Sequence, residues 1–168
     1  MLPGIGTGTG NRQQVSEIQA RYWADIAIGE QIVSAGATIA EREIKEFAVK
    51  FDPQPYHLDS EAGDKSIFGG LCASGWHVTA VMMRLLTDSF AARHIELLGS
   101  SSVRRVSWRK PVFANDCLKS TLTVANKSAS DDARYGYIEC DVDVKNQHHQ
   151  SVIILNTTLM VATGAEES

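Results

Sequence analysis

Cysteine is scarce in this sequence. Its three cysteines, Cys72, Cys117 and Cys140, are widely spaced and contain no CxxC pair. An odd, scattered set argues against the disulfide framework of a small secreted domain, and it supplies no zinc or thiol-redox motif. We therefore expect three reduced thiols.

The sequence also lacks an excess of basic residues and any long apolar run. Sixteen Lys and Arg against 20 Asp and Glu give a formal net charge of -4, which argues against a nucleic-acid partner. No apolar run approaches the roughly 20 residues that a membrane-spanning helix needs. The opening stretch MLPGIGTGTGNRQQ lacks the basic and apolar regions of a secretory signal. We therefore expect a cytoplasmic protein with neither nucleic acid nor membrane as a partner.

What is present is the composition of one folded domain. Hydrophobic residues make up 43% and charged residues 21% of the chain, which is typical of globular proteins. Residues 1–14 are rich in Gly, Thr and Gln, and we interpret them as a flexible tail before a single domain at residues 15–164. The GTGTG run in the tail has no preceding strand and no following GK[ST], so it does not indicate a phosphate-binding loop.

The first half of the domain has helical spacing. Thr38 and Glu41 have the spacing of a capping box, apolar residues recur behind them, and Pro53 follows. This pattern predicts a helix over about residues 39–50. Asp59 then has the position of a cap for a short helix over the letters SEAGDKS.

A longer helix and an antiparallel sheet account for the rest. An apolar stripe at i, i+3, i+4, i+7 and i+8 predicts the longest helix, over about residues 74–98. The stripe consists of Val78, Val81, Met82, Leu85 and Leu86. EQIVSAGATI, residues 30–39, suits a first strand, and from Ser101 onward the apolar residues alternate as in about four strands. This order predicts an α+β fold in which a sheet buries the apolar stripe of the long helix.

The stretch FDPQPYHLD, which begins at Phe51, contains candidate catalytic groups. Asp52 and His57 are a carboxylate and an imidazole on a proline-braced loop, which suits general acid–base chemistry. The same pattern suits a turn whose polar groups only satisfy the backbone, with a surface histidine.

Two further interpretations of these residues stay open at this point. His57 and Asp59 have the spacing of two arms of an iron site, with His77, His94 or His148 as the third ligand. Alternatively, the thiol of Cys72 is a nucleophile, with His57 or His77 as its base.

A glycine-rich segment, FGGLCASGW, follows the loop. Its last glycine, Gly75, stands where the long helix begins, and the first N–H groups of a helix have no partner within it. Such groups, together with the helix dipole, favour an oxyanion or a polarised carbonyl oxygen. The sequence therefore offers an acid–base pair and an N–H donor for chemistry next to a carbonyl.

These residues resemble a known family. FAVKFDPQPYHLDSEAGDKSIFGGLCASGWHV resembles the hydratase segment of MaoC-like dehydratases and (R)-specific enoyl-CoA hydratases. SVRRVSWRKPVFANDCLKSTLTV and VKNQ resemble two later turns of that family, so the likeness covers about residues 22–161. The resemblance implies a hot dog fold and a homodimer, or a dimer of dimers, with thioester sites near the subunit boundary. It implies that Asp52 and His57 are the catalytic pair, and that the N–H of Gly75 holds the thioester oxygen.

The function implied is reversible syn addition of water to a trans-2-enoyl thioester of coenzyme A or of an acyl carrier protein, without cofactor or metal. We also predict a set of substrate-binding residues: Gln54, Ser74, Trp76, Arg104 and Arg105. Arg104, Arg105 and Lys110 either meet the phosphates of coenzyme A or lie on a solvated strand edge. A hot dog acyl-CoA thioesterase and a non-catalytic acyl-thioester binder remain alternatives.

Four positions depart from the family pattern. These changes leave the predicted reaction type in place but make the choice of substrate uncertain from the sequence. They are Phe51 and Asn115 in place of Gly, Gln54 in place of Asn, and Ser74 in place of His.

Overall fold

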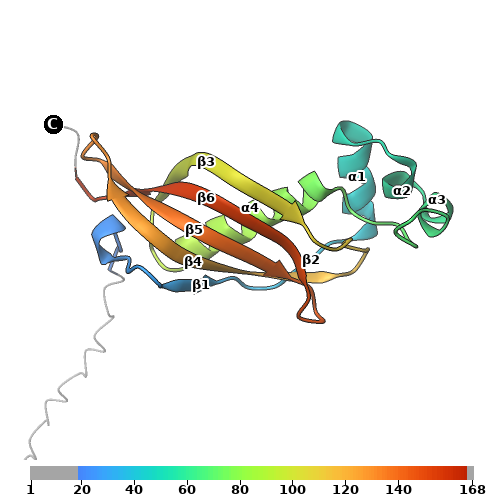
Figure 1. Ribbon diagram of the computed structural model, residues 1–168, viewed down its shortest axis with the longest axis horizontal. Coiled ribbons are helices and arrows are strands. Elements are labelled where there is room, and N and C mark those ends of the chain that lie inside the picture. Colours follow the sequence, from blue (N-terminus) through green and yellow to red (C-terminus); the bar gives the residue numbers. More distant parts are fainter. Residues whose placement is uncertain (1–18, 166–168) are drawn as a thin grey trace, which may run out of the picture.

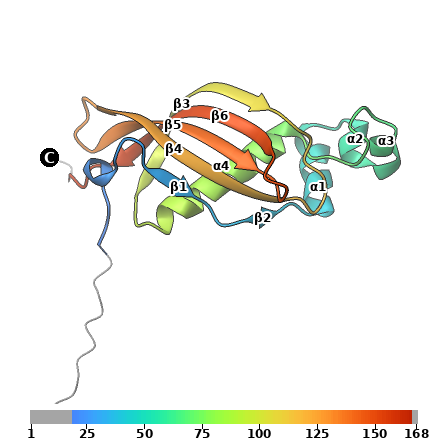
Figure 2. The same cartoon turned by 60° about the horizontal axis from the view of Figure 1, so that its bottom comes forward.

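A six-stranded antiparallel sheet and one long helix form the body of the molecule. The computed structural model describes residues 19–165, and the predicted tail at residues 1–14 lies outside them. The strands are β1 (Gln31–Val33), β2 (Ala37–Thr38), β3 (Leu97–Trp108), β4 (Cys117–Ala129), β5 (Tyr135–Lys145) and β6 (Ser151–Ala162). Their order is β1-β4-β5-β6-β3, and β2 also pairs with β4. Helix α4 (Gly75–Ala91) lies along one face of the sheet (Figures 1 and 2). The α+β prediction is confirmed.

The apolar stripe of α4 fills the space against the sheet. Four of its five predicted members are at most 5% exposed: Val78, Met82, Leu85 and Leu86. The alternation predicted for β5 is also present, because Ile138, Cys140, Val142 and Val144 are buried while the residues between them face outward. Each large apolar side chain buried in this way contributes about 1.5–3 kcal/mol relative to an exposed one.

A lobe of three shorter helices projects beyond one end of the sheet (Figure 1). The helices are α1 (Glu41–Phe51), α2 (Pro55–Leu58) and α3 (Ser60–Asp64). The predicted cap of α3 is confirmed, since Asp59 Oδ1 accepts a hydrogen bond from the N–H of Ala62 at 2.9 Å. A short 3₁₀ turn, Trp23–Asp25, precedes β1 near the opposite end. No helix in the described part of the chain is both long and apolar enough to cross a membrane.

Three predicted boundaries are wrong. The strand predicted at 30–39 is two short strands, because Ser34 leaves the regular ladder and its hydroxyl accepts from the N–H of Ser120. The capping box of α1 lies two residues later than predicted, with Glu43 accepting from the N–H of Ala40 at 2.8 Å. The helix predicted to reach residue 98 ends at Ala91, because His94 adopts a left-handed φ of 55°.

The stretch between Asp52 and Asp59 was predicted to be a proline-braced loop, but it contains the helical turn α2. Pro55 is the first residue of α2, where a proline loses no helical hydrogen bond because the first N–H groups have no partner. The proline therefore starts a helical turn rather than preventing one, and this turn carries His57.

Candidate active site

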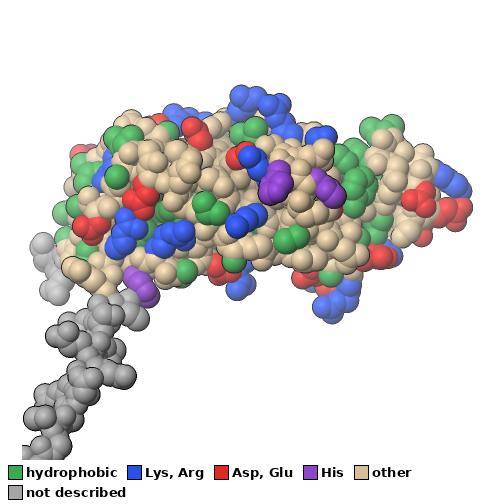
Figure 3. Space-filling model, turned by 90° about the horizontal axis from the view of Figure 1, so that it is seen from below, with side chains coloured by type: hydrophobic (Ala, Val, Ile, Leu, Met, Phe, Trp, Pro, Cys, Tyr) green, Lys and Arg blue, Asp and Glu red, His purple; other side chains and the backbone are tan. Residues whose placement is uncertain are grey.

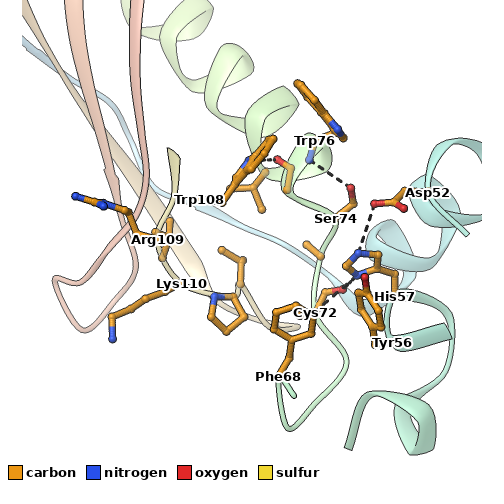
Figure 4. A pocket seen from close by; sticks show the side chains of 16 residues that line it. Asp52, Tyr56, His57, Phe68, Cys72, Ser74, Trp76, Trp108, Arg109 and Lys110 are labelled. Carbon is orange, nitrogen blue, oxygen red and sulfur yellow. Dashed lines mark hydrogen bonds and ion pairs between the residues drawn. The ribbon is translucent and has the colours of Figure 1, made fainter. Parts of the chain in front are cut away.

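The lobe, the start of α4 and the end of β3 enclose a cavity of about 380 Å³ (Figure 4). Asp52 and His57 line it from the lobe, Gly75 lines it from the first turn of α4, and Trp108 lines it from the end of β3. Three segments that are far apart in the sequence therefore meet around one space.

Asp52 and His57 lie next to each other on the lobe side of this cavity (Figure 4). His57 Nε2 lies 3.5 Å from Asp52 Oδ2. The imidazole is buried, with 7% of its side chain exposed, whereas 27% of the Asp52 side chain is accessible. Asp52 ends α1, with its N–H bonded to the carbonyl of Ala48, and α2 turns His57 back toward it. The structure therefore brings the predicted acid–base pair together.

A backbone carbonyl fixes the orientation of the His57 ring. His57 Nδ1 lies 2.6 Å from the carbonyl oxygen of Cys72. Because a carbonyl can only accept, Nδ1 carries the proton and Nε2 is the nitrogen that faces Asp52. The segment bearing this carbonyl packs directly on α3, where a Cβ at Gly63 would lie 2.5 Å from the N of Leu71.

The first turn of α4 presents a free N–H group to the same cavity. Ser74 caps the helix, and its hydroxyl accepts from the N–H of Trp76 at 3.3 Å. No acceptor within the described residues bonds to the N–H of Gly75, the first residue of the helix. The helix dipole adds about half a positive charge at this end. Gly75 lines the cavity, so the predicted amide donor belongs to a residue of the cavity wall.

The indole of Trp108 packs on this donor residue. Its Nε1 donates to the carbonyl of Gly75 at 2.9 Å and lies 3.3 Å from Thr79 Oγ1. A Cβ at position 75 would lie 2.8 Å from the indole ring, so only glycine fits without moving Trp108. Trp108 is not among the site residues predicted from the sequence. The only signal for it there is its place next to the letters RKPV at the end of a predicted strand.

The predicted substrate-binding residues divide into two groups. Ser74 and Trp76 line the cavity, whereas Gln54 is exposed at the start of α2 and does not. Arg104 pairs with Glu139 at 2.7 Å, and Arg105 donates to Ser107 at 3.1 Å; neither lines the cavity.

The cations that do line the cavity are Arg109 and Lys110, which follow β3 directly. Figure 4 shows both on the side away from Asp52 and His57.

The cysteine and metal interpretations receive no support from this geometry. Burial raises the pKa of the Cys72 thiol, so it is a poorer nucleophile than a free cysteine, and the nearby Nδ1 is already bonded to the Cys72 carbonyl. His77 points away from the cavity and stacks on Phe47 with ring centroids 4.8 Å apart. Among residues 19–165, no group of three His, Cys, Asp or Glu side chains is arranged to hold a metal ion.

Two turns recognised in the sequence lie against each other. Gln147 Nε2 donates to Asp116 Oδ1 at 2.7 Å, and Gln147 Oε1 accepts from the N–H of Cys117 at 3.1 Å. Asn115, which replaces a family glycine, has a φ of 69°, in the left-handed region that asparagine tolerates better than most residues. This departure from the family pattern therefore keeps the backbone conformation.

Comparisons with known proteins agree with this architecture. The family model described as a MaoC like domain matches residues 15–146. The solved MaoC-like dehydratase from Rhodospirillum rubrum is 35% identical, with 88% of this chain and 100% of that chain covered and a TM-score of 0.76. The (R)-hydratase PhaJ1 from Pseudomonas aeruginosa shares the fold at 22% identity and a TM-score of 0.66, over 88% of this chain and 91% of that one.

A curated relative, the uncharacterized protein YdeM of Bacillus subtilis, is 27% identical over 104 residues, which are 61% of this chain and 72% of that protein. The family match extends over most of the chain, and the solved dehydratase is similar over its whole length. This chain therefore belongs to the MaoC-like domain family of hot dog hydratases and dehydratases.

Proposed function

We propose that this protein is a hydro-lyase that adds water reversibly to a trans-2-enoyl thioester, giving an (R)-3-hydroxyacyl thioester. The proposal depends on one observation. The Asp52–His57 pair and the unpaired N–H of Gly75 line the same cavity, so a carbonyl bound by the amide has an acid–base pair beside its conjugated double bond.

In this proposal the N–H of Gly75 binds the thioester oxygen. Negative charge develops on that oxygen when water attacks C3, and the dipole of α4 favours it there. Removing one donor of this kind from an enzyme typically costs about 2.7–4 kcal/mol of transition-state stabilisation.

Asp52 and His57 act together on one water molecule. Nε2–H of the protonated imidazole donates to the water oxygen, and the water donates one O–H to the Asp52 carboxylate. As the oxygen bonds to C3, Asp52 takes the proton from water and Nε2 gives its proton to C2. The proton then returns from Asp52 to His57 across their 3.5 Å separation, which restores both groups. Both groups lie on one side of the bound substrate, which accounts for syn addition.

Of the three cations predicted from the sequence to meet the phosphates of the substrate, Arg104, Arg105 and Lys110, only Lys110 lines the cavity, and Arg109 lies beside it there. The phosphates of coenzyme A, or of a carrier protein's phosphopantetheine, would meet Arg109 and Lys110, since these cations line the cavity. Arg104 is paired with Glu139 and does not line the cavity.

The experiment is Asp52→Asn, assayed with crotonyl-CoA and longer enoyl-CoAs. Loss of the base should lower kcat by about 10²–10⁴-fold. Asp64→Asn, an exposed change on α3 outside the cavity, is the matched control and should hydrate at the parental rate.

An Asp52→Asn protein that hydrates as fast as the parent would remove Asp52 from the mechanism. Free thiol release by the parent would instead indicate a thioesterase. Tight thioester binding without turnover would indicate a binding protein.

A further inference from the structure

Trp108 is the side chain that connects the proposed carbonyl-binding residue to the sheet. It is the last residue of β3, where it pairs with Ile153 of β6. The next residue, Arg109, donates its N–H to the carbonyl of Val152 at 2.8 Å, so the strand stays tied to β6 beyond Trp108. The indole is therefore held by the sheet at its base while its Nε1 reaches into the first turn of α4.

The backbone of Gly75 would be poorly fixed without a side chain that binds it. Gly75 is the first residue of its helix, where ends fray, and glycine has the greatest backbone freedom of any residue. Its carbonyl receives two side-chain hydrogen bonds, from Trp108 Nε1 at 2.9 Å and from Thr79 Oγ1 at 2.9 Å. The indole ring also occupies the space on which a Cβ would intrude. Position 75 is thus fixed from the sheet side and from within the helix.

We propose that Trp108 is a positioning residue that aims the N–H of Gly75 at the thioester oxygen. This inference rests on the proposed hydratase function. A small rotation of the Gly75 backbone changes the direction of its N–H, and hydrogen bonds weaken steeply with misalignment. Because charge on the oxygen grows toward the transition state, misalignment lowers kcat more than it weakens ground-state binding.

The test is Trp108→Phe, which keeps an aromatic ring and removes the indole N–H. We expect kcat for crotonyl-CoA to fall about three- to tenfold, the range given by the loss of one ordinary hydrogen bond, while KM changes less than twofold. Thr79→Val, which removes the other side-chain donor to the same carbonyl, should lower kcat in the same direction. It also provides an independent test if Trp108→Phe folds poorly.

Trp23→Phe is a matched control. Trp23 Nε1 also donates to a backbone carbonyl, that of Tyr137 at 2.9 Å, but Trp23 belongs to the 3₁₀ turn before β1 and does not line the cavity. We expect Trp23→Phe to lower the free energy of unfolding about as much as Trp108→Phe does, and to keep the parental kcat. A general structural effect would lower kcat in both variants.

A spectroscopic measurement separates positioning from packing. Crotonyl-CoA carrying ¹³C at its thioester carbonyl is bound to Asp52→Asn, which blocks turnover, and the carbonyl stretch is followed by infrared difference. Adding Trp108→Phe should move the stretch back toward that of free thioester, and adding Trp23→Phe should not. An unchanged kcat and stretch in Trp108→Phe would overturn this inference and leave the hydratase intact, whereas a parent without hydratase activity would overturn both.

Discussion

At the scale of single residues, the cavity uses the backbone of Cys72 rather than its thiol. The carbonyl of Cys72 accepts a hydrogen bond from Nδ1–H of His57, and this bond depends on the path of the chain and not on the Cys72 side chain. The thiol lies 3.8 Å from the same nitrogen, but burial raises its pKa. The two proposals for the site, an acid–base pair and a thiol nucleophile, therefore make opposite predictions for a change at position 72.

We expect Cys72→Ala to hydrate crotonyl-CoA within about threefold of the parental rate, because the carbonyl stays in place while only a small buried side chain is removed. Steady-state kinetics at neutral pH measure this. In the same assay, the kcat of His57→Gln should be at least about a hundredfold lower than that of the parent, because the imidazole that donates the proton is absent. A comparable loss in Cys72→Ala would bring the nucleophile hypothesis back.

The sequence was sufficient to propose Asp52, His57 and Gly75 as site residues because each stands at a chain feature that is readable locally. The features are a helix end, the proline-rich stretch that follows it and a glycine at a helix start. It was not sufficient to choose between the basic residues of β3 and those directly after it. That strand shifts register against β6 at three places, so simple alternation no longer tells which side chains share a face. The cavity-lining cations could therefore be separated from Arg104 and Arg105 only in the folded chain.

At the scale of elements, α1 and α4 meet through an aromatic contact that contains a titratable group. The ring of His77, on α4, stacks on Phe47, on α1, at an interplanar angle of 7°. Its Nδ1 is buried and has no hydrogen-bond partner among the described residues. Burial lowers the pKa of His77, and the charge of Glu43 partly opposes this.

This contact predicts a pH-dependent stability. The unfolded chain binds a proton at His77 near the ordinary pKa of about 6.5, while the folded chain binds it only at lower pH. The free energy of unfolding should therefore fall as pH drops below about 6.5, down to the folded pKa. His77→Phe keeps the stacking and removes the titration, so its free energy of unfolding should fall less between pH 7.5 and pH 5.5. Urea unfolding at both values measures this, and equal falls in parent and variant would contradict it.

The C-terminal end of α4 could not be predicted from the local sequence pattern. The apolar stripe placed α4 correctly at its start, but nothing in the letters after Ala91 forbids another turn of helix. The end is determined by His94 adopting a left-handed conformation and by Ile95 turning into the core, where it is 3% exposed. Both depend on where β3 must begin in order to pair with β6, which is a tertiary constraint.

At the scale of the whole molecule, the sheet has two edges of unequal length. In the described chain, β1 and β3 end the strand order, with three and 12 residues. A long edge strand presents unpaired backbone groups, and β3 also exposes Leu98 and Val103, at 45% and 53%. We infer that the homodimer predicted from the sequence forms along β3, which would place the partner subunit beside the cavity at the Trp108 end.

A charge placed on β3 tests this assembly. In sedimentation experiments we expect the parent to have twice the mass of the 18.3 kDa chain. Val103→Lys should weaken dimerisation at least about tenfold, or 1.4 kcal/mol, because the ammonium group must be desolvated between the strands. Val33→Lys, at a valine that is 40% exposed on β1, carries the same change to the other edge and should remain dimeric. The reverse result would place the interface on β1, and a monomeric parent would show that one chain completes its own cavity.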